Sequence, residues 1–274
     1  MDQEQIVVEE LERLKSTILV KGMAFTDFVA DLGNLQGGYD ARAANYSEEI
    51  SGRQDKTQEL NLINKFFLGE LEQLIAGKQI DYLDVGCGDG VRTKYFFDEL
   101  SDFCSIARFE AVDYSTEMIK LAQRILGVER VNWGDLTNLR YDNEFDLITC
   151  MYAVIGHLPE SKIPTAFHNL YKSLREGGYL CIDVILEDPL GLERYGYNGN
   201  DGNSGKYMAY FIRSNGKLTT DDEDQPIVFT QRMFTLDEIE HYSTNAGFRI
   251  ISEKEICTTP DHKLFNKYAL ILQK

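Results

Sequence analysis

The sequence predicts an α/β fold, a doubly wound and mostly parallel sheet of seven strands with helices on both faces. One observation is that short apolar runs alternate with amphipathic runs at helical spacing from residue 80 onward. Strands that alternate with helices of about 10–15 residues are typical of parallel sheets with right-handed crossovers. A second observation is the run "YLDVGCGDG" at residues 82–90, in which an apolar strand passes directly into three glycines. Glycines at such a point indicate that another group comes very close to the backbone.

The chain before this alternation is predicted to be an N-terminal helical extension over residues 1–57. Apolar residues at helical spacing predict an amphipathic helix over residues 2–20. A glycine-bearing stretch follows, and its sequence has no pattern that assigns a secondary structure. A second amphipathic run predicts a helix over residues 58–76, which ends at Gly77 and opens the core of the fold.

The core is predicted from residues 58–185 together with residues 230–274. Ser115 is placed to cap a crossover helix, and Thr235 with Glu238 has the pattern of a capping box at the start of the last helix. The predicted strands cover residues 80–85, 107–114, 130–136, 145–154, 178–185, 248–256 and 267–273. The predicted helices between and after them cover residues 91–100, 115–126, 163–174 and 234–247.

Residues 186–229 interrupt this alternation and are predicted to be an insertion rather than a second folded domain. The stretch is rich in Gly, Asn and Asp, and it contains a hairpin-like run at residues 207–220. The pattern of the core resumes at about residue 230 with the last amphipathic helix.

Composition limits the class of protein. The 274 residues are 43% hydrophobic and 11% aromatic, which is ample for a packed core. A formal net charge of −17, without any Lys/Arg run, disfavours a nucleic-acid partner. The five cysteines are widely spaced without a zinc pattern, so they are expected to be reduced core residues. The acidic, amphipathic N-terminus and the lack of an apolar stretch of about 18 residues predict a cytoplasmic protein without a membrane span.

Four of the predicted strands end in residues that suit a ligand site, which in open α/β sheets lies beyond the carboxyl ends of the strands. The first strand is followed by Gly86, Gly88 and Gly90, a G-x-G-x-G spacing that differs from the G-x-G-x-x-G of dinucleotide-binding proteins. Asp84 and Asp89 crowd this loop. Two carboxylates there disfavour a diphosphate and favour a neutral or cationic ligand. The later strand ends carry Asp113, Gly134 with Asp135, and residues 151–157.

These motifs resemble those of the Rossmann-like, class I S-adenosylmethionine-dependent methyltransferases of the small-molecule type. "LDVGCGDG" is similar to the family's first cofactor motif, and "AVDYSTEMIKLA" is similar to the segment whose acid holds the ribose. "WGDL" resembles the adenine-contacting turn, "FDLITCMYAVIGHL" the active-site segment of the fourth strand, and "LREGGYLCIDV" the entry to the fifth strand. The resemblance covers roughly residues 39–185 and the C-terminal "FTLDEIEHYSTNAGF".

The resemblance implies a site for S-adenosyl-L-methionine and gives individual residues a role in it. Asp113 is expected to accept hydrogen bonds from both ribose hydroxyls, and Asp135 to accept one from the adenine amino group. Arg53 is expected either to pair with the carboxylate of the cofactor or to be a solvated surface residue. The helical spacing of Met118 fits the adenine site and also simple core packing. The residues expected to bind the cofactor are Tyr46, Arg53, Asp84, Gly86, Cys87, Gly88, Asp113, Tyr114, Met118, Asp135, Leu136 and Met151.

His157 follows the fourth strand, at the face where the resemblance places the reactive methyl group. Its unperturbed pKa of about 6.5 suits a base that takes a proton from a hydroxyl or ammonium acceptor. The alternative is a structural histidine that orients a loop. The residues expected to meet the acceptor are Tyr39, Tyr152, His157 and Tyr207, with the insertion 186–229 and the N-terminal helix as a lid.

The expected reaction is metal-independent methyl transfer to a nitrogen or oxygen of a small-molecule or peptide-like acceptor. Its main catalytic effect is expected to be the positioning of the acceptor atom in line with the methyl group. One alternative is an NAD-dependent oxidoreductase, which the glycine spacing and the acids beside the loop disfavour. Another is a non-catalytic S-adenosylmethionine-binding protein. Within the same fold, tRNA and protein acceptors are further alternatives, of which the net charge disfavours RNA, and a homodimer is left open.

Overall fold

The computed structural model describes residues 36–40, 43, 46, 54–187, 207–212, 227–256 and 266–274. For residues 54–59, 207–212 and 227–230 it describes the backbone alone. Several sequence predictions therefore lie outside the described part of the chain. They are the helix over residues 2–20, the site role of Arg53, the side chain of Tyr207, Cys257, and most of the insertion 186–229 with its role as a lid.

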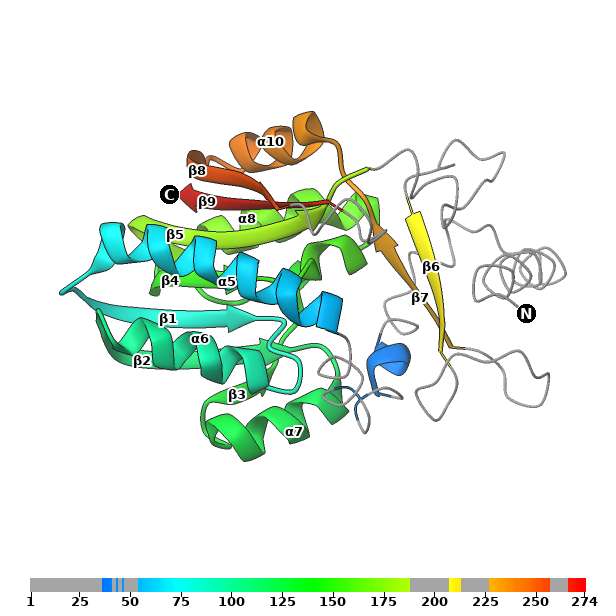
Figure 1. Ribbon diagram of the computed structural model, residues 1–274, viewed down its shortest axis with the longest axis horizontal. Helices are drawn as coiled ribbons and strands as arrows, with labels where there is room; N and C mark the ends of the chain where they lie inside the picture. Colours follow the sequence, from blue (N-terminus) through cyan, green and yellow to red (C-terminus); the bar gives the residue numbers. More distant parts are fainter. Residues whose placement is uncertain are drawn as a thin grey trace, which may run out of the picture.

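Seven strands form one sheet in the order β3-β2-β1-β4-β5-β9-β8 (Figure 1). Neighbouring strands from β3 to β5 are parallel, whereas β9 runs antiparallel to both β5 and β8. The chain reverses its direction of winding between β1 and β4, so the topological switch point lies between those strands. The strands are β1 (Gln79–Val85), β2 (Ser105–Asp113), β3 (Val131–Trp133), β4 (Phe145–Cys150), β5 (Leu174–Ile185), β8 (Arg249–Ile256) and β9 (Lys267–Gln273).

Helices cover both faces of this sheet, and each face has its own apolar core. Phe67, Phe96 and Ala122 are fully buried on the face covered by α5, α6 and α7. Phe167 and Ile239 are fully buried on the face covered by α8 and α10. The predicted fold class is thereby confirmed. The helices are α5 (Gln54–Ile75), α6 (Val91–Ser101), α7 (Thr116–Leu126), α8 (Ile163–Ser173) and α10 (Leu236–Asn245), with 3₁₀ helices η2 (Leu136–Asn138), η3 (Val154–His157) and η4 (Glu160–Lys162).

A separate antiparallel pair joins β6 (Tyr207–Ile212) to β7 (Ile227–Arg232). Of the hairpin-like run predicted at residues 207–220, the structure describes residues 207–212, and their partner in this pair is β7. The apolar, β-branched run "IVFT" in β7 suits strand pairing. Figure 1 shows the β6–β7 pair and segment 36–40 at the end of the main sheet toward which β1 points. Both stand beyond the carboxyl ends of the central strands.

Two strands of the main sheet end three or four residues earlier than the sequence predicts. β4 stops at Cys150 instead of residue 154, because Tyr152 and Ala153 have positive φ values of 68° and 63°. Left-handed backbone cannot continue a strand. β3 stops at Trp133 because Asp135 leaves the ladder to cap η2. Both shortened ends turn toward the same edge of the sheet.

Within the described residues, no helix is long and apolar enough to cross a membrane. Cys87, Cys104, Cys150 and Cys181 are buried and have free thiols, as predicted. Burial raises the pKa of the Cys150 thiol well above its ordinary value, which keeps it protonated and unreactive.

The capping box at the start of α10 leads to a prediction about stability. The Thr235 hydroxyl accepts from the Glu238 N–H at 3.2 Å, and the Glu238 carboxylate accepts from the Thr235 N–H at 3.0 Å. Thr235→Ala is expected to lower the free energy of unfolding by about 1 kcal/mol. Circular dichroism should then show a melting temperature about 2–4 °C lower. Thr244→Ala, which removes an exposed hydroxyl near the other end of α10, is the control, and an equal decrease there would contradict the capping role.

Candidate active site

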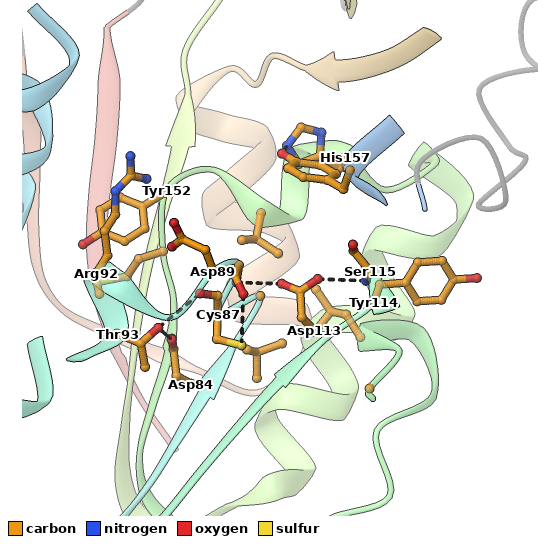
Figure 2. Close-up of a pocket in the computed structure, with 18 of the residues that line it drawn as sticks. Asp84, Cys87, Asp89, Arg92, Thr93, Asp113, Tyr114, Ser115, Tyr152 and His157 are labelled. Atoms are coloured by element: carbon orange, nitrogen blue, oxygen red, sulfur yellow. Dashed lines mark hydrogen bonds between the residues drawn. The ribbon is translucent and has the colours of Figure 1, made fainter. Parts of the chain in front are cut away.

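A pocket opens at the carboxyl ends of β1, β2 and β4, beside the switch point (Figure 2). Its walls come from the glycine loop, the ends of β2 and β3, the turn after β4 and the segment that contains residues 36–46. The pocket therefore brings together the four strand ends that the sequence singled out. The sequence-predicted residues in its lining are Tyr39, Tyr46, Asp84, Gly86, Cys87, Gly88, Asp113, Tyr114, Asp135, Leu136, Met151, Tyr152 and His157.

Asp113, the last residue of β2, connects two parts of this pocket. Its carboxylate accepts the N–H of Gly88 at 2.8 Å and the N–H of Ser115 at 2.8 Å. Desolvation raises the pKa of the Asp113 carboxyl above its ordinary value, and the backbone donors oppose this rise. Because a carboxylate has about four acceptor sites, both oxygens can also accept from a pair of hydroxyls.

Asp84 lies beneath the glycine loop and faces the pocket from the end of β1. Its carboxylate accepts hydrogen bonds from the hydroxyls of Thr93 and Thr149, each at 2.6 Å. Burial raises the pKa of Asp84 to about 6, although both hydroxyls stabilise the charged form. The carboxyl is therefore mostly charged at neutral pH and adds negative charge below the loop.

Two glycines of the loop are required for different reasons, one by close packing and one by access to the pocket. A Cβ on Gly86, which has a φ of 81°, would lie 2.5 Å from a methyl carbon of Val154, so this position has no room for a side chain. A Cβ on Gly88 would meet only the Tyr46 ring, at 4.0 Å. The backbone of Gly88 is therefore open toward the pocket, and a ligand can lie directly against it beneath Tyr46.

The wall near β3 combines an aromatic ring and an apolar side chain with an acid beside them. Asp135 caps η2 by accepting from the Thr137 N–H at 2.7 Å and the Thr137 hydroxyl at 2.8 Å. Leu136 is buried next to it, and the Tyr114 ring lies 5.6 Å from the ring of Trp133. This combination suits an aromatic base whose amino group points at a carboxylate.

A segment from the N-terminal extension covers the pocket and is fastened to the core by Asp40. The Asp40 carboxylate accepts from the Ser115 hydroxyl at 2.5 Å and from the Glu117 N–H at 3.1 Å, at the start of α7. A carboxylate at a helix N-terminus is favourable because it faces unpaired N–H groups and the positive end of the helix dipole. The neighbouring Tyr39 hydroxyl thereby lies 2.8 Å from Nε2 of His157.

Tyr152 and Arg92 form another wall of the pocket. The Tyr152 hydroxyl donates to Oδ1 of Asn64 at 2.7 Å, and the Arg92 guanidinium lies 4.7 Å from the centre of the Tyr152 ring (Figure 2). Nη2 of Arg92 is buried and has no hydrogen-bond partner. A buried, unpaired guanidinium N–H is costly, so this position suits an anionic group of a ligand.

The structure also shows what sequence reasoning did not foresee. Met118 is fully buried and does not line the pocket, because its helical spacing directs it into the core. Arg92 and Asp40 were missed as site residues, although Arg92 follows the glycine loop by two positions and that signal was available. Among the described residues, no cluster of three His, Cys, Asp or Glu side chains is placed to hold a metal ion.

The strand order and the pocket at the switch point define a Rossmann-like fold with a ligand site at the carboxyl ends of its strands. Comparison with known proteins agrees. Residues 83–178 match a family model described as a methyltransferase domain. The chain is 30% identical over 192 residues to the dTDP-3-amino-3,6-dideoxy-alpha-D-glucopyranose N,N-dimethyltransferase of Streptomyces fradiae, a match that covers 63% of this chain and 71% of the relative.

Solved structures show the same fold at lower identity. An S-adenosylmethionine-dependent methyltransferase from Clostridium acetobutylicum ATCC 824 has a TM-score of 0.55 at 19% identity, with coverage of 77% of this chain and 89% of that one. The 1,6-didemethyltoxoflavin-N1-methyltransferase of Burkholderia thailandensis, solved with S-adenosylhomocysteine, has a TM-score of 0.53 at 19% identity, with coverage of 85% and 87%.

The chain belongs to the class I S-adenosylmethionine-dependent methyltransferases, and its cofactor is S-adenosyl-L-methionine. The alternatives of an NAD-dependent oxidoreductase and of a non-catalytic binding protein are set aside by this membership. The residues present fit the cofactor, since the open backbone at Gly88 offers a cradle and the unpaired Nη2 of Arg92 offers a partner for a carboxylate.

The raised pKa of Asp84 leads to a prediction about stability and pH. The folded protein holds the Asp84 proton more tightly than the unfolded chain, because burial raises the pKa from 3.8 to about 6. The stability that this group contributes is therefore present at low pH and lost as the pH rises through 6. Between pH 5 and pH 7.5, the wild type should lose roughly 1 kcal/mol of unfolding free energy relative to Asp84→Asn.

Urea unfolding at the two pH values measures this difference. Asp98→Asn is the control, because Asp98 is an exposed carboxylate that pairs with Lys94 on the surface of α6. The control should track the wild type across the range. A gap between the wild type and Asp84→Asn that stays constant with pH would contradict the raised pKa.

Proposed function

We propose that the enzyme transfers the methyl group to a nitrogen or oxygen atom of a small-molecule or peptide-like acceptor, with an amine favoured. The observation that carries this proposal is the pairing of Tyr39 and His157 across the pocket, where the Tyr39 hydroxyl lies 2.8 Å from Nε2 of His157. A carbon acceptor with no proton on its reacting atom would have no use for such a pair at this position.

The bound cofactor supplies an electrophilic methyl group on a sulfonium, so the acceptor needs positioning more than activation. Tyr39 and His157 can together remove the proton that the acceptor loses, with His157 as the final proton acceptor. When the Tyr39 hydroxyl donates to Nε2 of His157, the Tyr39 oxygen is the atom that accepts from the acceptor. The acceptor's proton then reaches Tyr39 as the tyrosine's own proton passes to His157, and the tyrosine remains neutral throughout.

Two relatives support a nitrogen acceptor over an oxygen acceptor. The Streptomyces fradiae relative is named as an N,N-dimethyltransferase of an amino sugar nucleotide, and the Burkholderia thailandensis neighbour as an N1-methyltransferase. Both act on small molecules by name. The acidic residues at the pocket, Asp84 and Asp89, are also compatible with an acceptor that arrives as an ammonium ion.

The cofactor is proposed to lie across the pocket with its adenosine at β2 and β3 and its amino-acid part beyond β1. Asp113 would accept from the ribose hydroxyls, and Asp135 from the adenine amino group. The amino-acid part then reaches the wall formed by Arg92 and Tyr152, where the unpaired Nη2 of Arg92 would meet the carboxylate. This assigns to Arg92 the role that sequence reasoning offered to Arg53.

The proposal predicts amine methylation that depends on His157. The full-length protein is incubated with S-adenosylmethionine and, in separate reactions, with primary amines, hydroxy acids, short peptides and dTDP-3-amino-3,6-dideoxy-alpha-D-glucopyranose, and S-adenosylhomocysteine release is measured by mass spectrometry. An amine acceptor should be methylated. His157→Ala should lower kcat about tenfold or more at pH 7, and less at pH 9, where a larger fraction of the amine is already deprotonated.

Tyr39→Phe should lower kcat in the same direction. Calorimetric titration with S-adenosylhomocysteine should show that both variants keep their cofactor affinity, since neither side chain is assigned to the cofactor. His168→Ala, on α8, is the control. Turnover at the wild-type level in His157→Ala would remove the base role, and methylation of hydroxy acids alone would replace the amine with an oxygen acceptor.

The role of Arg92 is tested by measuring how wild type and an Arg92 variant bind two ligands, one with the carboxylate and one without it. Arg92→Gln should weaken S-adenosylhomocysteine binding about tenfold to a hundredfold, because a charge-assisted hydrogen bond contributes about 1.5–3 kcal/mol. The analogue that lacks the carboxylate, 5′-(3-aminopropylthio)adenosine, should bind wild type and variant alike. Arg124→Gln, on the exposed side of α7, is the control. Equal loss for both ligands would place the carboxylate elsewhere, with Arg53 as the next residue to test.

A further inference from the structure

The turn after β4 has an unusual backbone. Tyr152 and Ala153 are consecutive, neither is glycine, and both have positive φ values, 68° and 63°. Such residues are costly to hold in the left-handed region and persist only where the surrounding structure enforces them. The described contacts of the turn therefore identify what enforces it.

Two buried side chains hold the turn from opposite sides. The carboxylate of Asp183, on β5, accepts the backbone N–H of Tyr152. Nε2 of Gln231, on β7, donates to the backbone carbonyl of Ala153 at 2.9 Å. Neither residue lines the pocket, so neither contacts a ligand there.

Both supports are themselves anchored. Asp183 forms an ion pair with Lys267 of β9 at 3.0 Å, and both side chains are buried. Gln231 packs so tightly against η3 that a Cβ on Gly156 would lie 1.9 Å from its Nε2. The support from Asp183 thus comes from the core sheet, whereas the support from Gln231 comes from the β6–β7 pair.

The turn controls two parts of the pocket at once. Tyr152 lies with Arg92 on one side, and His157, at the end of η3, lies on another side against Tyr39 (Figure 2). A change in the backbone at Tyr152 and Ala153 would therefore shift the wall proposed for the amino-acid part and the proposed base together. A displacement of about 1 Å at a reacting group can cost about a hundredfold in rate.

We infer that Gln231 and Asp183 are positioning residues, which hold the strained turn so that His157 meets Tyr39. Through Gln231, the β6–β7 pair takes part in setting the position of His157. The effect of both residues on turnover rests on the proposed function, because it assumes that His157 serves the reaction. Their effect on the position of His157 does not depend on that assumption.

Gln231→Met tests the inference, since it keeps the length of the side chain and removes the donor. The readout is the imidazole ¹⁵N spectrum of histidine-labelled protein, in which the His157 signals are assigned by their loss in His157→Ala. In Gln231→Met, the His157 signals should shift while those of His168 and His241 stay. Turnover of the amine acceptor should fall about tenfold, and affinity for S-adenosylhomocysteine should fall less than turnover.

Gln123→Met is the matched control. Gln123 also donates from Nε2 to a backbone carbonyl, that of Val131 at 3.1 Å, but on α7 and away from the pocket lining. It should leave the His157 signals and turnover unchanged. Removal of Asp183 alone would take the ion-pair partner from the buried Lys267. The second variant is therefore the pair Asp183→Leu with Lys267→Met, which removes the acceptor of the Tyr152 N–H and should shift the same His157 signals.

Unchanged His157 signals in both variants would overturn the inference, whatever happens to turnover. Most of the reduction in turnover caused by Gln231→Met should disappear in the His157→Ala background, because the larger part of the effect acts through His157. If the His157 signals shift but His157→Ala itself has wild-type turnover, the base role fails while the positioning role stands.

Discussion

The pocket depends on one carboxylate, that of Asp113, more than on any other side chain. Its two oxygens accept from Gly88 and Ser115, so it joins the loop after β1 to the start of α7. These donors belong to two different crossover connections, and Asp113 at the end of β2 joins them. Asp40 extends the same junction to the N-terminal segment, because it binds the hydroxyl of Ser115. The cover of the pocket is therefore placed by the same junction that shapes its floor.

This junction leaves a pocket with a particular distribution of charge. Three carboxylates lie around the glycine loop, those of Asp84, Asp89 and Asp113. The wall of the pocket that contains Arg92 carries a positive charge and an unpaired N–H donor. A dinucleotide diphosphate would meet the acids at the loop and be repelled. S-adenosylmethionine carries a sulfonium and an ammonium as well as one carboxylate. Its two positive charges suit the acids near the loop, and its carboxylate suits Arg92. The net charge of −17 also favours a cationic ligand over a nucleic acid, because a negatively charged protein attracts cations and repels a phosphate backbone.

The sequence was informative wherever a feature is local. The capping box of Thr235 and Glu238, the N-cap at Ser115 and the acid at the end of β2 each depend on residues a few positions apart, and each is present in the structure. Features that depend on residues far apart along the chain could not be predicted from the sequence. The strand that pairs with β6 is β7, and Asp40 binds the start of a helix 75 residues away from it along the chain. The position of Arg92 just after the glycine loop is visible in the sequence, but its unpaired donor is a property of its surroundings and not of its residue type.

The end of β4 shows most clearly why pattern alone is insufficient at a site. The run "FDLITCMYAV" is apolar and β-prone throughout, and local preference would extend the strand to residue 154. Asp183 and Gln231 override that preference by binding the backbone of Tyr152 and Ala153 in a conformation neither residue favours. A relaxed strand would carry His157 away from the mouth of the pocket, since each extra strand residue advances the chain by about 3.3 Å. Conflict between local preference and tertiary contacts is expected at functional sites, because the geometry that serves the ligand is seldom the one the backbone would choose. The strained turn is thus what allows one short segment to face both Arg92 and Tyr39, on two sides of the same pocket.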